Sequence, residues 1–416
     1  MAALAPKPAR AFDVVLYGAS GFVGVQTVVH FARHAPPGLR WALAGRNADK
    51  LEAARAAAGA RASGAGIVIA DAHHAPALQR LAAQARVVLS TAGPFSLHGS
   101  ALVAACVEQR THYVDITGET PWVRGLIERH HARAAADGTR IVPLCGFDSV
   151  PSDLGCWLLA QALWQAHGEP CVEVKAAFSI SGGVNGGTLA SMLALADSGQ
   201  LRLLADPFLL NPPGSVPPDA AAQADDDAPH RDADFDAWLA PFVMAPVNTR
   251  VVRRSIALLT AAADPALHAG LRYRESMRVG RGAGAALAAA ALGFGSLAAT
   301  GAMRLAPVRS LARRLMPKPG EGPSERAMDA GRFRCDLVGR TAGGHVLRGR
   351  IAGRGDPGNR ATTVFVCEAA LALAVDGASL PGGPARGGLL TPATAFGAVL
   401  ARRLRSAGMT VEPLPA

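Results

Sequence analysis

The sequence predicts an α/β fold in which helices cover both faces of a parallel sheet. Short apolar runs alternate with helix-length segments along the first part of the chain, which is typical of consecutive strand–helix units. The first of these runs ends in a glycine-rich turn that opens a helical pattern. The predicted strands are Phe12–Tyr17, Arg40–Ala44, Ile67–Ile69, Val87–Ser90, Thr111–Val114 and Ile141–Leu144.

The turn after the first strand has the spacing Gly-x-x-Gly-x-x-Gly. A glycine where the strand ends permits a tight turn. The other two glycines allow the pyrophosphate of a dinucleotide to approach the backbone and the helix N-terminus. The turn therefore predicts a dinucleotide site. The residues expected to contact the cofactor are Gly18, Ala19, Ser20, Gly21, Phe22, Val23 and Gly24.

The second strand leads into Gly45-Arg46-Asn47. A dinucleotide fold that selects NAD usually places an acidic residue here to hold the ribose 2′-hydroxyl, whereas an arginine can hold a 2′-phosphate. Arg46 and Asn47 are therefore expected to contact the cofactor, which is predicted to be NADP(H). The alternative is that Arg46 only caps a surface loop.

The residues after the third and fourth strands are further candidates, because ligands of parallel sheets bind at the carboxyl ends of the strands. Asp71 is expected near the adenine side, and residues 91–94 near the nicotinamide half. The alternatives are a helix cap for Asp71 and an ordinary turn at Gly93-Pro94. The second segment consists of Thr91, Ala92, Gly93 and Pro94.

The loops after the fifth and sixth strands carry polar side chains suited to positioning a substrate and supplying a proton. Asp148 and Ser149 fit a structural role equally well. Ser152 and Asp153 are expected to cap the helix that follows, and Cys145 to be a buried thiol. The candidate catalytic residues are Tyr113, Asp148 and Ser149, with Asp115, Glu119 and Cys145 nearby in the chain.

Two other kinds of oxidoreductase site are excluded by residue spacing. Short-chain dehydrogenases use a tyrosine followed by a lysine four residues later, and none of the three tyrosines here has that lysine. The six cysteines lie far apart and form neither a Cys-x-x-Cys pair nor a His/Cys cluster. No metal site is predicted, so zinc-dependent alcohol oxidation would lack its electrophile.

The formal net charge of +10 does not predict nucleic-acid binding, because the arginines are scattered and have no aromatic residues between them. An anionic substrate or a membrane surface is the partner that this charge allows. The N-terminus contains prolines and lacks an apolar region of signal-peptide length. We therefore expect a cytoplasmic protein.

The length of 416 residues allows two domains, because single cores usually stop growing at about 250–300 residues. Residues 211–236 replace the apolar pattern with prolines and acidic residues and are expected to be a surface excursion. Gly186-Gly187-Thr188 opens a helix after an alternating strand. A simple turn is one interpretation of that segment, and a helix N-terminus that binds an anionic carrier of the substrate is the other.

Residues 282–315 form a second unusual stretch. Gly282–Met303 carries no charged side chain, but it consists mostly of alanine and glycine and does not predict a spanning helix. The residues that follow alternate arginines with leucines in a basic amphipathic pattern. The segment therefore predicts either peripheral contact with an anionic membrane or a buried helix followed by a solvated surface helix.

Motifs along nearly the whole chain carry a family resemblance. They are Gly-Ala-Ser-Gly-Phe-Val-Gly at 18–24, Ala-Gly-Arg at 44–46, Thr-Ala-Gly-Pro-Phe at 91–95, Tyr-Val-Asp-Ile-Thr-Gly-Glu at 113–119, Gly-Phe-Asp-Ser-Val-Pro-Ser-Asp at 146–153, Ser-Gly-Gly-Val-Asn-Gly-Gly-Thr at 181–188, Lys-Pro-Gly-Glu-Gly-Pro-Ser-Glu at 318–325, Gly-Asp-Pro-Gly at 355–358 and Gly-Gly-Leu-Leu-Thr-Pro-Ala-Thr-Ala at 387–395. This set resembles the saccharopine dehydrogenase-like oxidoreductases, in the branch of the trans-acting enoyl reductases. Relatives usually carry a tyrosine where this chain has Asn359, so no role of that tyrosine is transferred.

The resemblance implies a Rossmann-type doubly wound parallel sheet and a second α/β (α+β) domain inserted before a returning C-terminal helix, Thr391–Ala407. The NADP-binding domain is then expected at 11–147 and about 387–416. The substrate and dimerisation domain is expected at 148–386.

The resemblance also implies NADPH-dependent reduction of an enoyl group on a lipid or polyketide-type acyl thioester, with the substrate on a carrier protein and the enzyme as a homodimer. Two alternatives remain open. One is a saccharopine-type amino-acid dehydrogenase, which would need arginines near the nicotinamide. The other is a lipid-associated protein that binds the nucleotide without turnover.

Overall fold

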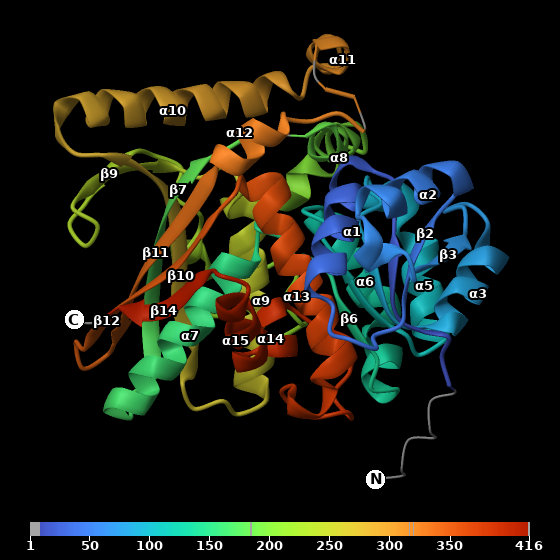
Figure 1. The fold of residues 1–416 in the computed structure, drawn as a ribbon. Coiled ribbons are helices and arrows are strands. Elements are labelled where there is room, and N and C mark those ends of the chain that lie inside the picture. The colour runs from blue at the N-terminus through green and yellow to red at the C-terminus, as the bar shows by residue number, and fades with distance from the viewer. Residues whose placement is uncertain (1–8, 184, 316, 319, 415–416) are drawn as a thin grey trace.

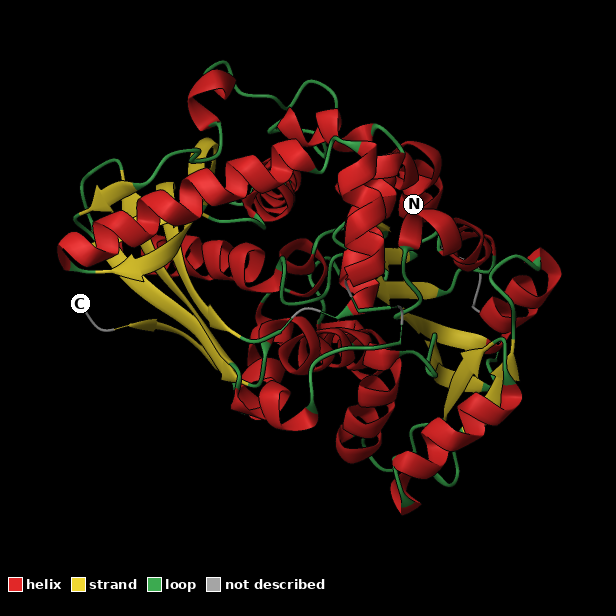
Figure 2. Ribbon diagram, turned by 90° about the horizontal axis from the view of Figure 1, so that it is seen from above, coloured by secondary structure: helices red, strands yellow, loops and turns green. Residues whose placement is uncertain are grey.

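The protein contains two seven-stranded sheets with helices packed between and around them (Figure 1). The computed structural model describes residues 9–183, 185–315, 317–318 and 320–414. Seen from above, the two sheets lie on opposite sides of the molecule and helices fill the space between them (Figure 2). The predicted α/β class, with a doubly wound parallel sheet, is confirmed.

The first sheet is parallel throughout and has the order β13-β6-β5-β4-β1-β2-β3. Its order reverses between β1 and β4, which is where parallel α/β sheets open a crevice for a ligand. The six predicted strands are confirmed, with ends that shift by one or two residues. The strands are β1 (Phe12–Tyr17), β2 (Trp41–Gly45), β3 (Gly66–Ile69), β4 (Ala85–Ser90), β5 (His112–Asp115), β6 (Arg140–Val142) and β13 (Gly388–Leu389).

Helices connect the strands of this first sheet and cover it. One α-helix connects each strand to the next in the chain from β1 to β6, except that two α-helices lie between β4 and β5. The connecting helices are α1 (Phe22–His34), α2 (Ala48–Ala57), α3 (Ala75–Gln84), α4 (Phe95–His98), α5 (Ser100–Glu108) and α6 (Thr120–Ala136).

The second sheet is mixed and has the order β14-β12-β11-β7-β10-β9-β8. Only the β7–β10 pair is parallel among its described pairs. Its strands are β7 (Cys171–Ser181), β8 (His230–Asp232), β9 (Ala237–Pro241), β10 (Leu267–Gly280), β11 (Arg332–Thr341), β12 (Val346–Arg354) and β14 (Thr410–Leu414). The helices of this part are α7 (Val150–His167), α8 (Gly186–Asp197), α9 (Ala245–Ala261), α10 (Gly282–Ala302), α11 (Ala306–Leu315) and α12 (Glu325–Ala330).

The C-terminal part differs from the expected domain boundaries in two ways. Helix α13 (Thr362–Val375), expected in the second domain, packs against α1 and against strands β1, β4 and β5 of the first sheet. Strand β14, expected in the first domain, pairs with β12 of the second sheet. Helix α13 is apolar on all sides and needs burial on all sides, which the space between the layers provides.

The expected returning helix over Thr391–Ala407 is present as two helices. They are α14 (Pro392–Phe396) and α15 (Ala398–Ser406). Gly397 separates them with a φ of +50°, a conformation that residues with a side chain rarely adopt. The chain therefore turns within the segment that the sequence predicts as continuous.

The excursion at 211–236 is not simply a surface loop. Asp225 forms an ion pair with Arg250 of α9 and a second one with Arg253 at 3.5 Å, and both arginines are buried. A buried guanidinium needs a counter-charge or full hydrogen bonding. The acidic run therefore supplies a structural partner to the second domain, while most residues of the segment are exposed or half-buried, as expected of a surface excursion.

Aromatic side chains join the two sheets at the loop that follows β6. The ring of Phe147 lies 6.1 Å from that of Phe178 in β7 and 5.0 Å from that of Phe333 in β11. Phe365 of α13 contacts Phe333 at 5.7 Å. These contacts hold the loop after β6, which carries Asp148, between the two sheets.

Candidate functional site

The glycine turn after β1 is built so that two of its glycines cannot be replaced. Gly18 has a φ of +82°, and a Cβ there would lie 2.8 Å from the backbone nitrogen of Ala92. A Cβ on Gly24 would lie 2.1 Å from the carbonyl oxygen of Gly18. The turn therefore packs directly on the loop after β4, and α1 packs directly on the turn.

Helix α1 begins with an open N-terminus. Gly21 is its N-cap and is exposed, no side chain caps the helix, and its first turn contains no acidic residue. The positive end of the helix dipole is therefore accessible to solvent. This cradle fits the pyrophosphate of NADP(H), which the backbone of residues 18–24 would hold.

The end of β2 presents a guanidinium to solvent. Arg46 is exposed, and its side chain has no hydrogen-bond partner among the described residues. The Asn47 side chain instead accepts a hydrogen bond from the backbone nitrogen of Lys50 at 2.9 Å and caps α2. Arg46 is thus available for a 2′-phosphate, while the Asn47 side chain already serves the helix.

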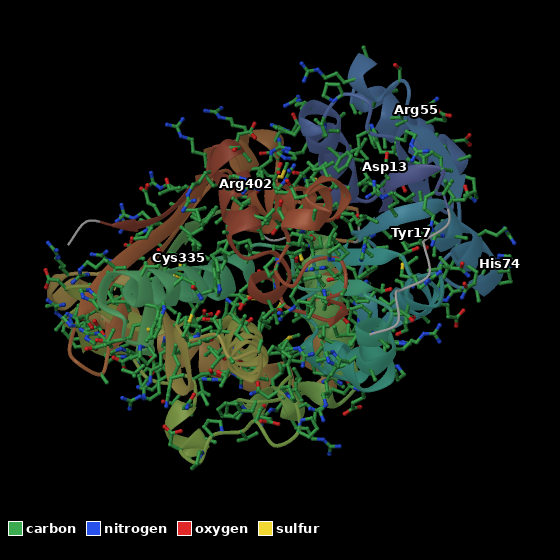
Figure 3. All side chains as sticks on the ribbon, turned by 90° about the horizontal axis from the view of Figure 1, so that it is seen from below. Asp13, Tyr17, Arg55, His74, Cys335 and Arg402 are labelled. Atoms are coloured by element: carbon green, nitrogen blue, oxygen red, sulfur yellow. The ribbon has the colours of Figure 1, made fainter. Side chains whose placement is uncertain are left out.

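Asp71 lies on the same edge of the sheet as Arg46. Burial raises the pKa of Tyr17 to about 12; the charge of Asp71 adds to this rise and that of Arg46 opposes it, so both side chains lie near the phenol. Asp71 also accepts a hydrogen bond from the backbone nitrogen of His73 at 2.8 Å. Its carboxylate therefore closes a turn just after β3. Figure 3 labels Tyr17 in this first domain, well away from Cys335 in the second sheet.

The loop after β4 is fixed against the glycine turn and against the second domain. Thr91 Oγ1 lies 3.2 Å from the carbonyl oxygen of Gly18 and donates to it. The buried Glu119 carboxylate accepts hydrogen bonds from the backbone nitrogens of Phe95 and Ser96 at 2.8 and 2.9 Å. Its third donor is Ser191 Oγ of α8 at 2.8 Å. Residues 91–94 therefore lie beside the glycine turn. Sequence reasoning missed Ser191 because it is distant in the chain.

Tyr113 lies in the interior of the protein. Its side chain is fully buried, and its hydroxyl donates to Asp115 Oδ2 at 3.0 Å. Burial raises the pKa of Asp115 to about 7, although its carboxylate also accepts from the backbone nitrogens of Thr117 and Leu144. This geometry favours a role for Tyr113 and Asp115 in holding the loops after β5 and β6, rather than direct contact with a substrate.

Asp148 has a different environment. It is half-buried, and no described residue forms a hydrogen bond with its carboxylate. Burial raises its pKa to about 6. A Cβ on Gly118 would lie 3.8 Å from Asp148 Oδ2 and 3.9 Å from the methyl group of Met244. Asp148 is therefore a carboxyl group at the strand ends that can exchange a proton near neutral pH, beside an apolar side chain.

Ser149 belongs to a buried network behind Asp148. Its hydroxyl donates to Asn248 Oδ1 at 3.4 Å, and Asn248 Nδ2 donates to Glu275 Oε1 at 2.8 Å. Glu275 also accepts from Ser152 at 2.6 Å and from Tyr273 at 2.9 Å, and burial raises its pKa to about 7. The network ties α7 to α9 and β10, so its geometry favours a supporting role for Ser149.

The expected helix-capping roles of Ser152 and Asp153 were wrong. Ser149 is the N-cap of α7, and no side chain caps that helix. Asp153 instead accepts from the backbone nitrogen of Ala393 in α14 at 2.7 Å and from Ser255 Oγ. It therefore joins the returning C-terminal segment to α7, an interaction between positions far apart in the sequence.

The N-terminus of α8 is already capped. Asn185 Oδ1 accepts from the backbone nitrogen of Thr188 at 3.0 Å, and the nitrogen of Gly186 donates to the carbonyl oxygen of Glu321 at 3.0 Å. Asn359 accepts from Asn185 Nδ2 at 2.8 Å. These contacts favour the simple turn over a site for an anionic carrier. Asn359, which stands where relatives usually carry a tyrosine, holds the side chain of the capping residue Asn185 in place.

All six cysteines are buried and free, including Cys145, whose pKa burial raises well above its usual range. Within the described residues, no group of three or more His, Cys, Asp or Glu side chains is arranged to hold a metal ion.

Comparison with known proteins agrees with this geometry. A family model described as the saccharopine dehydrogenase NADP binding domain matches residues 14–142. A trans-acting enoyl reductase from Mycobacterium bovis is 38% identical over 97% of this chain and 97% of its own. A Mycobacterium tuberculosis protein provisionally named as a trans-acting enoyl reductase is 41% identical over the same shares. The chain belongs to the trans-acting enoyl reductase branch of the saccharopine dehydrogenase-like oxidoreductases.

The fold of this reductase also matches a solved structure. Apo saccharopine dehydrogenase (L-Glu forming) from Saccharomyces cerevisiae aligns with a TM-score of 0.51, covering 96% of this chain and 99% of that one. The identity is 13%, so this likeness concerns the fold alone. The reductase is an NADP(H)-dependent oxidoreductase, as its sequence predicts.

Proposed function

We propose that this reductase reduces the C=C bond of an enoyl group on a lipid or polyketide-type acyl thioester. NADPH supplies the hydride, which adds to the β-carbon, and a proton is added to the α-carbon, so that the thioester becomes saturated and NADP⁺ is released. The names of the curated relatives support this reaction.

Asp148 is the residue that carries the proposal. Its half-buried carboxyl group has a pKa of about 6 and no hydrogen-bond partner among the described residues, so it is free to deliver the proton directly or through water. The side chain of Met244, which like Asp148 lies beside Gly118, offers an apolar surface to an acyl chain. The loops at 91–96, 116–119 and 144–149 contain no arginine or lysine, which disfavours a saccharopine-type substrate with several carboxylates.

The test compares NADPH oxidation with trans-2-dodecenoyl-CoA and NADP⁺ reduction with saccharopine, because saccharopine is the hydride donor of its own reaction. We expect NADPH to be consumed with the enoyl thioester, at a rate that falls as the pH rises through about 6 because the donor must be protonated, and no NADPH to form with saccharopine. NADPH formation from NADP⁺ and saccharopine, without NADPH consumption by the enoyl thioester, would contradict the proposal. NADPH binding without turnover of either compound would identify a silent nucleotide-binding protein instead.

The variant Asp148→Asn should lower kcat by about 10²–10⁴-fold and remove the pH dependence near 6, while leaving NADPH affinity unchanged. The matched control is Asp227→Asn, which neutralises an exposed carboxylate in the second domain that has no side-chain partner among the described residues. An Asp148→Asn enzyme with a normal rate and pH profile would show that the proton comes from elsewhere.

A further inference from the structure

Helices α10 and α11 form an arm along one side of the molecule with their apolar faces outward. In Figure 1, α10 lies above the second sheet, and α11 lies above α8 and α1. Helix α10 is long and apolar enough to cross a membrane, yet only 11% of its most apolar window is buried. An apolar helix of a soluble protein usually turns its large side chains into the core.

Helix α10 turns its small side chains inward. Ala289 and Gly293, one turn apart, are its buried residues, and Gly293 packs against Pro229 and Pro241 beside β9. The large side chains lie on the remaining faces: Leu287 is 75% exposed and Phe294 is 72% exposed. Packing on the protein therefore explains the position of α10, but it does not explain why its leucines and its phenylalanine are exposed.

Helix α11 is inverted in the same sense. Its arginine face is tied to the protein, because Arg309 and Arg313 both pair with Asp197 at the end of α8. Its leucines face solvent, with Leu311 56% and Leu315 76% exposed. A surface helix normally presents its charges to water and its leucines to the protein. Both helices thus expose apolar side chains that the described residues do not cover, and both lie at the top of the molecule in Figure 1.

The charges of the arm identify the partner. Residues 281–315 contain five arginines and no acidic residue. Arg304 and Arg314 are exposed and have no side-chain partner among the described residues. A second copy of this chain bound through the same surface would place two arms that carry only positive charges against each other. An anionic lipid surface would accept both the apolar side chains and the cations.

We propose that the α10–α11 arm lies in the surface of an anionic lipid bilayer. Its inner side rests on β9 and α8, so the helices lie along the bilayer rather than across it. The chain that leaves the arm reaches the cofactor turn directly: a Cβ on Gly322 would lie 2.4 Å from the Phe22 ring at the start of α1. The bilayer would therefore adjoin the crevice, which suits a membrane-held acyl substrate if the proposed function holds.

The experiment is co-sedimentation of the full-length protein with vesicles of phosphatidylcholine alone or mixed with phosphatidylglycerol. We expect binding to the mixed vesicles and release by high salt or alkaline carbonate. Leu287→Ser/Phe294→Ser should weaken binding more than about tenfold. Arg304→Gln/Arg314→Gln should weaken it by about fivefold per arginine, on the anionic vesicles only.

The control is Val346→Ser, which removes an exposed apolar side chain at the start of β12, outside the arm, and should not affect binding. Vesicle binding that both arm variants leave intact would overturn the proposal. A dimer in light scattering that Leu287→Ser/Phe294→Ser converts to a monomer, without vesicle binding by the wild type, would assign the arm to a second copy. NADPH oxidation with a short soluble enoyl-CoA should be unchanged in both arm variants, so the result is independent of the proposed reaction.

Discussion

The glycine turn after β1 and the α10–α11 arm are both rich in small residues, but the small residues have opposite surroundings. In the turn, Gly18 and Gly24 are small because backbone atoms lie where a Cβ would be. In α10, Gly284, Gly295 and Gly301 have no neighbour within 4 Å of such a Cβ. The turn is packed closely by backbone atoms and leaves only the N-terminus of α1 exposed, whereas the outer side of the arm has no packing partner among the described residues.

This difference shows how a partner can be inferred in two ways. At the turn, the partner is indicated by donors that converge on an open space, namely the uncapped amides of α1. At the arm, it is indicated by apolar side chains that have no reason to be exposed. The first kind of site predicts a specific anion, and the second predicts only a class of surface together with its charge.

The largest expected effect comes from closing the opening of the turn. Gly21→Asp places a favourable N-cap residue on α1, so we expect thermal stability to be maintained. Its carboxylate would occupy the position proposed for the pyrophosphate, and like charges in contact cost several kcal/mol, so NADPH affinity should fall at least about 100-fold. NADPH fluorescence titration beside a thermal melt measures both.

The matched variant Gly21→Asn caps the helix without the charge, and it should retain much more NADPH affinity than Gly21→Asp. Equal losses in the two variants would mean that the added side chain, and not its charge, obstructs the turn. Unchanged affinity in both would show that the pyrophosphate binds elsewhere.

A smaller effect is expected at the ribose end of the same site. Arg46→Glu should weaken NADPH binding by about 1.5–3 kcal/mol, the usual contribution of a hydrogen bond to a charged group, and should leave NADH binding unchanged or improved. The control Arg80→Glu makes the same charge change at an exposed position on α3. If Arg46→Glu and Arg80→Glu affect the two cofactors alike, Arg46 does not recognise the 2′-phosphate.

The first sheet could be predicted because its signals are local. Each strand is a short apolar run, and the glycine turn follows from a spacing of three residues. The exposed Arg46 at the end of β2 follows from the same pattern. Local signals of this kind depend on the backbone of one segment, so they hold whatever the rest of the chain does.

The internal contacts of the site could not be predicted because they join distant segments. Glu119 accepts a hydrogen bond from Ser191, 72 residues away, and Asp153 accepts one from the backbone nitrogen of Ala393, 240 residues away. In the sequence, a carboxylate near the start of a helix looks the same whether it caps that helix or binds the backbone of a distant one. The assignment of α13 to a sheet had the same difficulty, since an apolar pattern predicts burial but not the partner.

The comparison between turn and arm is sharpened by the smallest expected effect, which concerns two glycines of α10. Gly295 has open space around it, so Gly295→Ala should stabilise the protein by up to about 1 kcal/mol through helix propensity alone. Gly293 faces β9, and a Cβ there would lie 2.9 Å from Cγ of Pro229. Gly293→Ala should therefore lose that gain and destabilise the packing. The free energies of unfolding of the two variants in urea test this prediction. Equal stabilisation would mean that α10 does not pack on β9 in solution and that both of its faces are equally exposed.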